Sequence, residues 1–199
     1  MEQLEERIRH RFGLNIETHM AMAETLSKPI ANAATRLVNC LLRDNKILLC
    51  GHGGSAANCL HFSAAMLNHF DVERPPLPVI ALSTDVSIVT GLANEGYSEL
   101  LFARQIQALG QQGDMLITLS TSGNANSILQ AIDAAHDRGI DIIALNGRDG
   151  GRLANHLGPE DIELRVPGGN PALIREMHLF ILHCFCDLID QSLFGTGTT

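Results

Sequence analysis

The stretch that most constrains this fold is residues 46–70, where an apolar run meets a glycine-rich turn and then a segment with helical spacing. The run KILLC has the length of a buried strand, and GHGGS follows it directly. Glycines can adopt positive φ, and the N–H groups of a first helical turn attract negative charge. The stretch therefore predicts either an anion-binding turn, in which Ser55 supplies a hydroxyl, or an ordinary strand-to-helix turn with Ser55 as the helix N-cap.

The same arrangement occurs a second time. An apolar run at 114–119 is followed by Ser120, Thr121 and Ser122, and helical spacing resumes over 125–139. Serine and threonine also cap helices without binding any ligand, so a second capped turn is the alternative. Because the ligands of parallel sheets bind at the carboxyl ends of the strands, we expect the two turns to face one pocket for a phosphate-like anion.

Three more apolar segments, at 79–83, 140–145 and 161–166, alternate with helical segments, of which the last covers residues 171–193. Strands that alternate with helices predict a mostly parallel sheet that is covered on both faces. The length of 199 residues fits one domain, with an α/β core over 44–194.

The N-terminal segment, residues 1–43, contains more helix than a sheet of this size needs. Apolar spacing predicts helices over 2–12 and 16–43, with a break near 27–29 where Pro29 suits the first turn of a new helix. An amphipathic helix with spare apolar surface favours a symmetric oligomer built on a helical bundle. The alternative is that these helices pack back on their own sheet.

Charge and composition exclude several classes of protein. Lys and Arg number 14 against 22 Asp and Glu, and no basic run occurs, which argues against direct binding of nucleic acid. No apolar stretch reaches the roughly 20 residues that span a bilayer, and the charged N-terminus is unlike a signal peptide, so we expect a cytoplasmic protein without membrane contact. The five cysteines lack paired spacing and predict reduced core thiols.

Four motifs together resemble the SIS (sugar isomerase) domain family: GHGGSAANCLHFSA, ALSTD, LSTSGNANSI and VPGGNPALIREMHL. Within that family the chain is similar to the phosphoheptose isomerases and to their non-catalytic relative that associates with the bacterial replication initiator DnaA. The resemblance covers nearly the whole chain. It implies a three-layer αβα sandwich with a five-stranded parallel sheet, a homotetramer, and a phosphosugar pocket at subunit interfaces.

The resemblance also implies which residues bind the phosphosugar. The family's phosphate-binding hydroxyls fall on Ser55, Ser120, Thr121 and Ser122, whereas a further phosphate serine of the family is Ala125 here. The rest of the predicted phosphosugar site is Gly53, Gly54, Asp85 and His52, which stands where the family usually has Asn.

The isomerases of the family carry a metal and acid/base set that this chain holds only in part. Moving a proton between C1 and C2 of a ketose requires a base beside the carbon and an electrophile on the carbonyl oxygen. His61 and His183 match the family's histidines. Ala65, Ala172 and Arg175 stand where the family has Glu, an acidic residue and Gln. Two histidines can hold zinc weakly, but a nearby arginine would repel it.

Each of these histidines has an ordinary alternative as a polar residue satisfied by hydrogen bonds, and Glu176 can replace the missing base only if its side chain points inward. The missing carboxylates favour a non-catalytic regulator that keeps a phosphosugar pocket, needs no cofactor and binds DnaA, with Leu193 and Phe194 as the partner-binding pair. The alternative is an isomerase that converts sedoheptulose 7-phosphate to D-glycero-D-manno-heptose 7-phosphate with His61 and His183, and zinc is expected only in that case. A sensor that binds a sugar phosphate is a third, weaker hypothesis.

Overall fold

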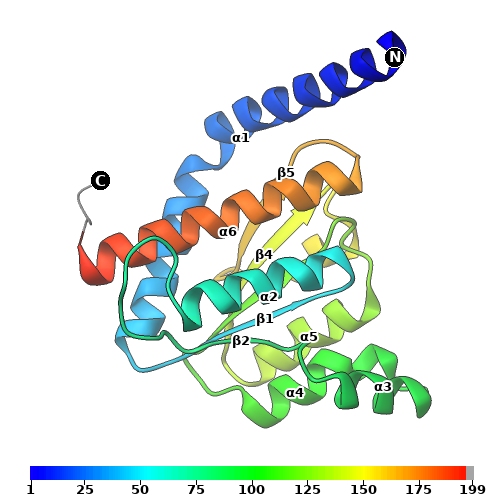
Figure 1. The fold of residues 1–199 in the computed structure, drawn as a ribbon. Helices are drawn as coiled ribbons and strands as arrows, with labels where there is room; N and C mark the ends of the chain where they lie inside the picture. The colour runs from blue at the N-terminus through cyan, green and yellow to red at the C-terminus, as the bar shows by residue number, and fades with distance from the viewer. Residues whose placement is uncertain (196–199) are drawn as a thin grey trace.

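The computed structural model describes residues 1–195, which form one long helix followed by an α/β unit (Figure 1). The elements in chain order are α1 (Glu2–Leu42), β1 (Ile47–Gly51), α2 (Gly54–Leu67), β2 (Val79–Ala81), α3 (Val86–Asn94), the 3₁₀ turn η1 (Ser98–Leu100), α4 (Leu101–Leu109), β3 (Met115–Leu119), α5 (Asn126–Asp137), β4 (Asp141–Gly147), the 3₁₀ turn η2 (Gly151–Asn155), β5 (Ile162–Val166) and α6 (Pro171–Phe194).

The five strands form one sheet in the order β2-β1-β3-β4-β5, and every neighbouring pair is parallel. All residues of β1 and β3 are buried, as expected for central strands that are covered on both faces. In the register, Gly51 at the end of β1 lies opposite Leu119 at the end of β3. The predicted five-stranded parallel sheet is confirmed, and the glycine-rich turn after β1 and the serine-rich turn after β3 leave the sheet at the same edge.

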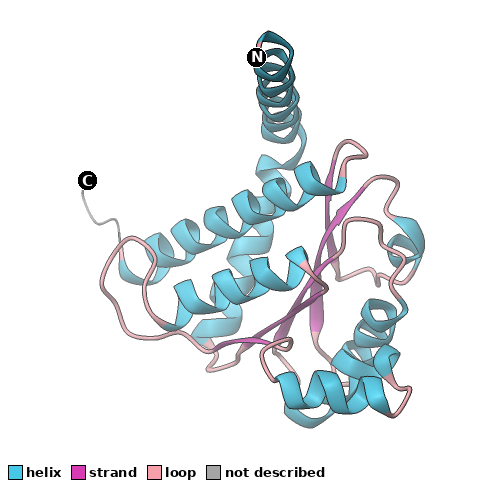
Figure 2. Ribbon diagram, turned by 45° about the vertical axis from the view of Figure 1, so that its right-hand side comes forward, coloured by secondary structure: helices cyan, strands magenta, loops and turns pink. Residues whose placement is uncertain are grey.

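Two separate hydrophobic cores, one on each face of the sheet, make this a three-layer sandwich. Successive side chains of a strand point to opposite faces. Leu49 therefore packs with Phe62 and Phe185 beneath α1, α2 and α6, whereas Leu48 packs with Phe102 beneath α4 and α5. Figure 2 shows the sheet between these two helical layers.

The predicted break near residues 27–29 is wrong, because α1 is one continuous helix of 41 residues with Pro29 inside it. Proline in a helix interior removes one backbone hydrogen bond and costs about 3 kcal/mol. Met22 and Leu26 before the proline and Ile30 and Leu37 after it are all buried in the same core. Burial on both sides of Pro29 outweighs the local cost. The gap predicted between residues 12 and 16 is also absent, so one helix is present where the sequence predicted at least two.

The N-terminal half of α1 projects away from the rest of the chain (Figures 1 and 2). It carries large apolar side chains at every fourth position, each 57–66% exposed, which therefore lie on one face of the helix. This apolar stripe consists of Leu4, Ile8, Phe12, Ile16 and Met20.

None of the helices within residues 1–195 is long and apolar enough to cross a membrane. All five cysteines are unpaired, and four of them are buried, in agreement with the prediction of core thiols.

Candidate functional site

The first loop, residues 51–55, connects β1 to α2. Its turn is made at Gly53, whose φ of 56° is in the left-handed region that glycine tolerates. The helix begins at Gly54 and no side chain caps it, so the prediction that Ser55 is the N-cap is wrong. The positive φ at Gly53 starts the helix early, and this places Ser55 inside its first turn, where the residue is buried.

The second loop, residues 120–125, connects β3 to α5 and packs against the segment that follows β4. The N–H of Gly123 donates to Oγ of Ser120 at 2.9 Å, and Gly123 has a φ of 65°. The carbonyl of Gly123 accepts from the N–H of Leu153 at 2.9 Å. A Cβ atom added at Gly123 would lie only 1.9 Å from the carbonyl oxygen of Gly150. The turn after β4 therefore packs tightly against the second loop and limits its movement.

The two loops meet at the carboxyl edge of the sheet. A Cβ atom at Gly51 would lie 3.1 Å from the carbonyl oxygen of Leu119, so the strand ends touch. His52 of the first loop forms a 2.5 Å hydrogen bond through Nε2 to Oγ of Ser127 in the first turn of α5. Its ring also packs 5.0 Å from that of Phe102, and burial lowers the pKa of His52.

Most of the predicted phosphate-binding hydroxyls are available at this edge. Within residues 1–195 the side chains of Ser55, Thr121 and Ser122 form no hydrogen bond to protein, whereas Ser120 accepts one from the loop itself. The positive ends of α2 and α5 lie beside them, which favours an anion. Their role as phosphosugar ligands stays a prediction, as it does for Gly53, Gly54 and His52.

Asp85 lies after β2, the strand on the other side of β1. Its Oδ1 accepts hydrogen bonds from the N–H groups of Ser87 at 2.8 Å and Ile88 at 3.2 Å, so Asp85 is the N-cap of α3. Aspartate is a favoured N-cap residue, so this role needs no ligand, and contact of Asp85 with a phosphosugar stays a prediction.

His61 and His183 come together between α2 and α6. Their Nε2 atoms are 2.8 Å apart, so one ring donates a hydrogen bond to the other, and the ring of Phe70 lies 5.3 Å from that of His183. Burial is the main cause that lowers the pKa of His183, and the charge of His61 acts in the same direction while Asp71 opposes it. The pair predicted from the sequence is therefore a real side-chain contact, with His183 neutral at neutral pH.

The residues around this pair do not fit a zinc site. Catalytic zinc is held by three protein ligands and structural zinc by four. Across residues 1–195 no group of three or more His, Cys, Asp or Glu side chains is placed to hold a metal ion. Glu176 does not fill the gap, because its carboxylate accepts from Nδ2 of Asn15 at 2.8 Å and lies 4.0 Å from Arg11, both on α1. The prediction that Glu176 can act as a base has no support in this geometry.

Arg175 of α6 lies across the start of α2. A Cβ atom at Gly54 would come within 2.7 Å of Cδ and 2.8 Å of Nε of Arg175, so this side chain occupies the space that the glycine leaves. Asn58, one turn further along α2, donates a 2.9 Å hydrogen bond from Nδ2 to the carbonyl of Arg175. The arginine is thus a neighbour of the first loop, which the sequence did not indicate.

A buried histidine that the sequence did not indicate, His178, contacts the turn after β4, which in turn packs against the second loop. His178 is fully buried in α6 and its Nε2 bonds to the carbonyl of Asn146 at 3.0 Å. Nδ2 of Asn146 donates to the carbonyl of Gly150 at 2.7 Å. Burial lowers the pKa of His178 to about 4. His178 is 32 residues away from Asn146 in the sequence, so no local pattern connects the histidine to this turn.

Leu193 and Phe194, the predicted partner-binding pair, close the end of α6. Leu193 packs against the core, while Phe194 is 43% exposed with its ring 5.9 Å from Cζ of Arg74. Arg74 is buried and pairs with Asp190 at 2.6 Å. The contacts show how the helix end is sealed, and the partner-binding role stays a prediction.

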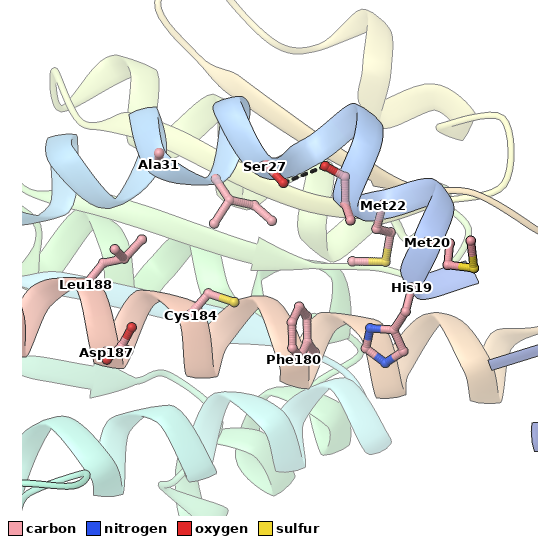
Figure 3. Close-up of a pocket in the computed structure, with 11 residues that line it drawn as sticks. His19, Met20, Met22, Ser27, Ala31, Phe180, Cys184, Asp187 and Leu188 are labelled. Carbon is pink, nitrogen blue, oxygen red and sulfur yellow. Dashed lines mark hydrogen bonds between the residues drawn. The ribbon is translucent and has the colours of Figure 1, made fainter. Parts of the chain in front are cut away.

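A groove of about 660 Å³ lies between α1 and α6, away from the two loops (Figure 3). Its lining is mostly apolar, and the rings of His19 and Phe180 meet edge to face at one end with centroids 4.7 Å apart. The groove includes Met22, Ile30, Phe180, Cys184 and Leu188.

The fold and the paired loops define a parallel α/β domain with a candidate ligand site at the carboxyl edge of the sheet. The SIS domain family matches residues 15–147. Phosphoheptose isomerases of Shewanella sp. (strain W3-18-1) and Shewanella baltica (strain OS155) are each 50% identical to this chain over 189 residues, which is 95% of the chain and 96% of each relative. The chain belongs to the SIS domain family and, within it, to the phosphoheptose isomerases and their close relatives.

Two solved structures agree with this assignment. A phosphoheptose isomerase from Francisella tularensis is 44% identical with a TM-score of 0.91, and the match covers 94% of this chain and 97% of that one. A phosphoheptose isomerase from Neisseria gonorrhoeae is 40% identical with a TM-score of 0.89, and covers 94% and 99% respectively.

Proposed function

We propose that this protein binds a phosphorylated sugar where the first and second loops meet. The observation that carries the proposal is that free hydroxyls from both loops and the positive ends of two helices share one edge of the sheet. Oxygen-rich, electropositive turns of this kind suit a phosphate group. The names of the relatives make a sugar phosphate the first ligand to test.

The reaction named for the relatives is the first candidate activity: isomerisation of sedoheptulose 7-phosphate to D-glycero-D-manno-heptose 7-phosphate. Identity of 50% over 95% of the chain supports it. In this chain the pair His61 and His183 is the candidate for proton transfer, since His183 is neutral and can accept a proton from carbon. No step is assigned to zinc, because the donor set does not fit it.

A non-catalytic regulator is the second candidate, and the donor set favours it. Ala65 and Ala172 bring no carboxylate to the histidine pair, and the residue that stands where the family has Gln, Arg175, lies beside Gly54 at the start of α2. Loss of several groups that act as a unit typically costs orders of magnitude in rate. Association with DnaA belongs to this candidate and rests on the resemblance alone, whereas the named relatives favour the isomerase.

Proton exchange separates the two candidates. The protein is incubated with sedoheptulose 7-phosphate in heavy water, with and without added zinc, and the C1 protons are followed by NMR. An isomerase exchanges these protons above the buffer control and loses the signal in His183→Ala. A regulator shows no exchange, yet the ligand raises its melting temperature, and a pull-down with purified DnaA then tests the partner.

We also propose that the chain assembles as a homotetramer through α1. The apolar stripe on its projecting half and the apolar groove between α1 and α6 are both without cover within residues 1–195. Exposed apolar surface of this extent is typical of interfaces. Light scattering of Ile8→Asp with Phe12→Asp should give a smaller assembly than the unmodified chain, and an unchanged mass would contradict the proposal.

A further inference from the structure

Arg175 is a charged side chain whose guanidinium has no role in the fold or in the function proposed above. Within residues 1–195 its guanidinium forms no ion pair and donates no hydrogen bond, and only its backbone carbonyl is engaged, by Asn58. Arginine offers five donors in a fixed plane and remains charged at any physiological pH. A guanidinium that is positioned without a protein partner is available to a ligand.

The position of Arg175 is built into the fold. Its aliphatic stem fills the space beside Gly54, where any Cβ atom would come within 2.7 Å of Cδ. Its backbone is fixed by Asn58, one turn along α2. The side chain is half-buried, so packing limits the directions in which the guanidinium can extend. This arrangement places a fixed positive charge next to the first loop.

Three of the four hydroxyls proposed for the first phosphate come from the second loop, and the fourth is Ser55 of the first loop. Ser120, Thr121 and Ser122 follow β3, whereas Arg175 contacts the loop that follows β1. Arg175 belongs to α6 and lies beside Gly54 at the start of α2, so its guanidinium and the hydroxyls of the second loop reach the pocket from different elements. A ligand that lies across both loops can therefore meet donors from two sides.

We propose that Arg175 makes the pocket selective for phosphorylated sugars that carry a second anionic group, either a carboxylate or another phosphate, at the end remote from the first phosphate. This inference rests on the proposed binding of a sugar phosphate. An arginine that pairs with a carboxylate or phosphate forms charge-assisted, often bidentate hydrogen bonds. A neutral hydroxyl or carbonyl at that end of the sugar cannot replace them.

Isothermal titration calorimetry of the full chain with three matched ligands tests the proposal. Glucose 6-phosphate has one anionic group, 6-phosphogluconate adds a carboxylate at C1, and glucose 1,6-bisphosphate adds a phosphate at C1. We expect one or both of the latter two to bind at least about tenfold more tightly than glucose 6-phosphate. Which of them binds more tightly identifies the second group.

Three variants show whether Arg175 causes the preference. Arg175→Gln should reduce it to about twofold or less, with a much smaller change in affinity for glucose 6-phosphate, and Arg175→Lys should keep part of it. Gly54→Ala keeps the charge but displaces the stem, and should also reduce the preference. Melting temperatures confirm that each variant is folded.

Two results would overturn the inference while leaving the proposed function intact. One is equal affinity of the unmodified chain for all three ligands. The other is an equal loss for all three ligands in Arg175→Gln, since Arg175 would then bind the first phosphate. If none of the three ligands, nor sedoheptulose 7-phosphate, nor inorganic phosphate binds, the proposed function itself fails and the inference fails with it.

Discussion

The first and second loops look alike in the sequence but differ in their surroundings. Both are turns from a buried strand into a helix, and both contain a glycine with positive φ. Behind the second loop, the carbonyl of Gly150 leaves no room for a side chain at Gly123. A Cβ atom at Gly53 of the first loop would meet no atom within 4 Å.

The difference in support between the two loops suggests that they contribute to ligand binding in different ways. The second loop is held by the turn after β4, so its hydroxyls keep a fixed arrangement before any ligand arrives, which reduces the entropy lost on binding. The first loop has open space at Gly53, and it contacts Ser127 through His52 and Arg175 through Gly54. We infer that the second loop, together with Ser55, recognises the common phosphate, while the rest of the first loop adapts to the variable part of the ligand.

The largest effect is expected from Gly123→Ala. The added methyl group would collide with the Gly150 carbonyl and also force alanine into a left-handed conformation. Overpacking and backbone strain together should lower the free energy of unfolding by roughly 2–5 kcal/mol. Urea unfolding measures the loss, and a stability equal to that of the unmodified chain would show that the second loop is not rigidly supported.

The second largest effect is expected from acid, which should destabilise the contact between His178 and the turn behind the second loop. The pKa of His178 is about 4 in the folded chain and 6.5 in the unfolded one, so unfolding takes up a proton between these values. The stability that neutral His178 contributes is complete above pH 6.5 and is lost as the pH falls toward 4. Between about pH 7.5 and about pH 5 the free energy of unfolding should fall by roughly 2 kcal/mol.

His178→Gln is the matched variant for this acid effect. Glutamine retains an N–H donor for the Asn146 carbonyl but does not titrate. Urea unfolding of both proteins at the two pH values should give a smaller decrease for the variant. An equal decrease in both would assign the acid sensitivity to other groups.

Gly53→Ala should cost less than Gly123→Ala, although both glycines have positive φ. No atom opposes the methyl group at Gly53, so only the backbone term of about 1–2 kcal/mol remains. Urea unfolding of the two alanine variants side by side gives the contribution of the Gly150 contact directly. If the two losses are equal, the close approach behind the second loop has no energetic consequence.

The sequence predicted the fold because each element has a local signal. Continuous apolar runs indicated the buried strands, and their alternation with helical segments indicated a parallel sheet. The error at Pro29 shows the limit of this approach. Proline disfavours a helix locally, but the buried faces before and after it belong to one core that only the folded chain contains.

The candidate site was predictable only in part, for a similar reason. The loop hydroxyls and the pair His61 and His183 follow from motifs, whereas Arg175 at Gly54 and His178 behind Asn146 are contacts between distant segments. No spacing rule predicts which helix lies across a given glycine. Glu176 illustrates the opposite error, since it is next to Arg175 in sequence but contacts α1.

The smallest effect is expected where the two loops are joined, at the hydrogen bond between His52 and Ser127. Ser127→Ala removes the 2.5 Å contact and should cost about 1 kcal/mol or less of stability, because the His52 ring can reach water. The first loop would then be less ordered before binding, so the affinity for glucose 6-phosphate should fall by a small factor, about two- to fivefold. Ser127→Thr retains the hydroxyl and is the control for both calorimetry and unfolding.

Because the second loop keeps its contact with the turn after β4, Ser127→Ala should leave the acid sensitivity that His178 causes unchanged. A loss of stability as large as that of Gly123→Ala would mean that the two loops form one rigid unit, and the division of duties between them would be wrong.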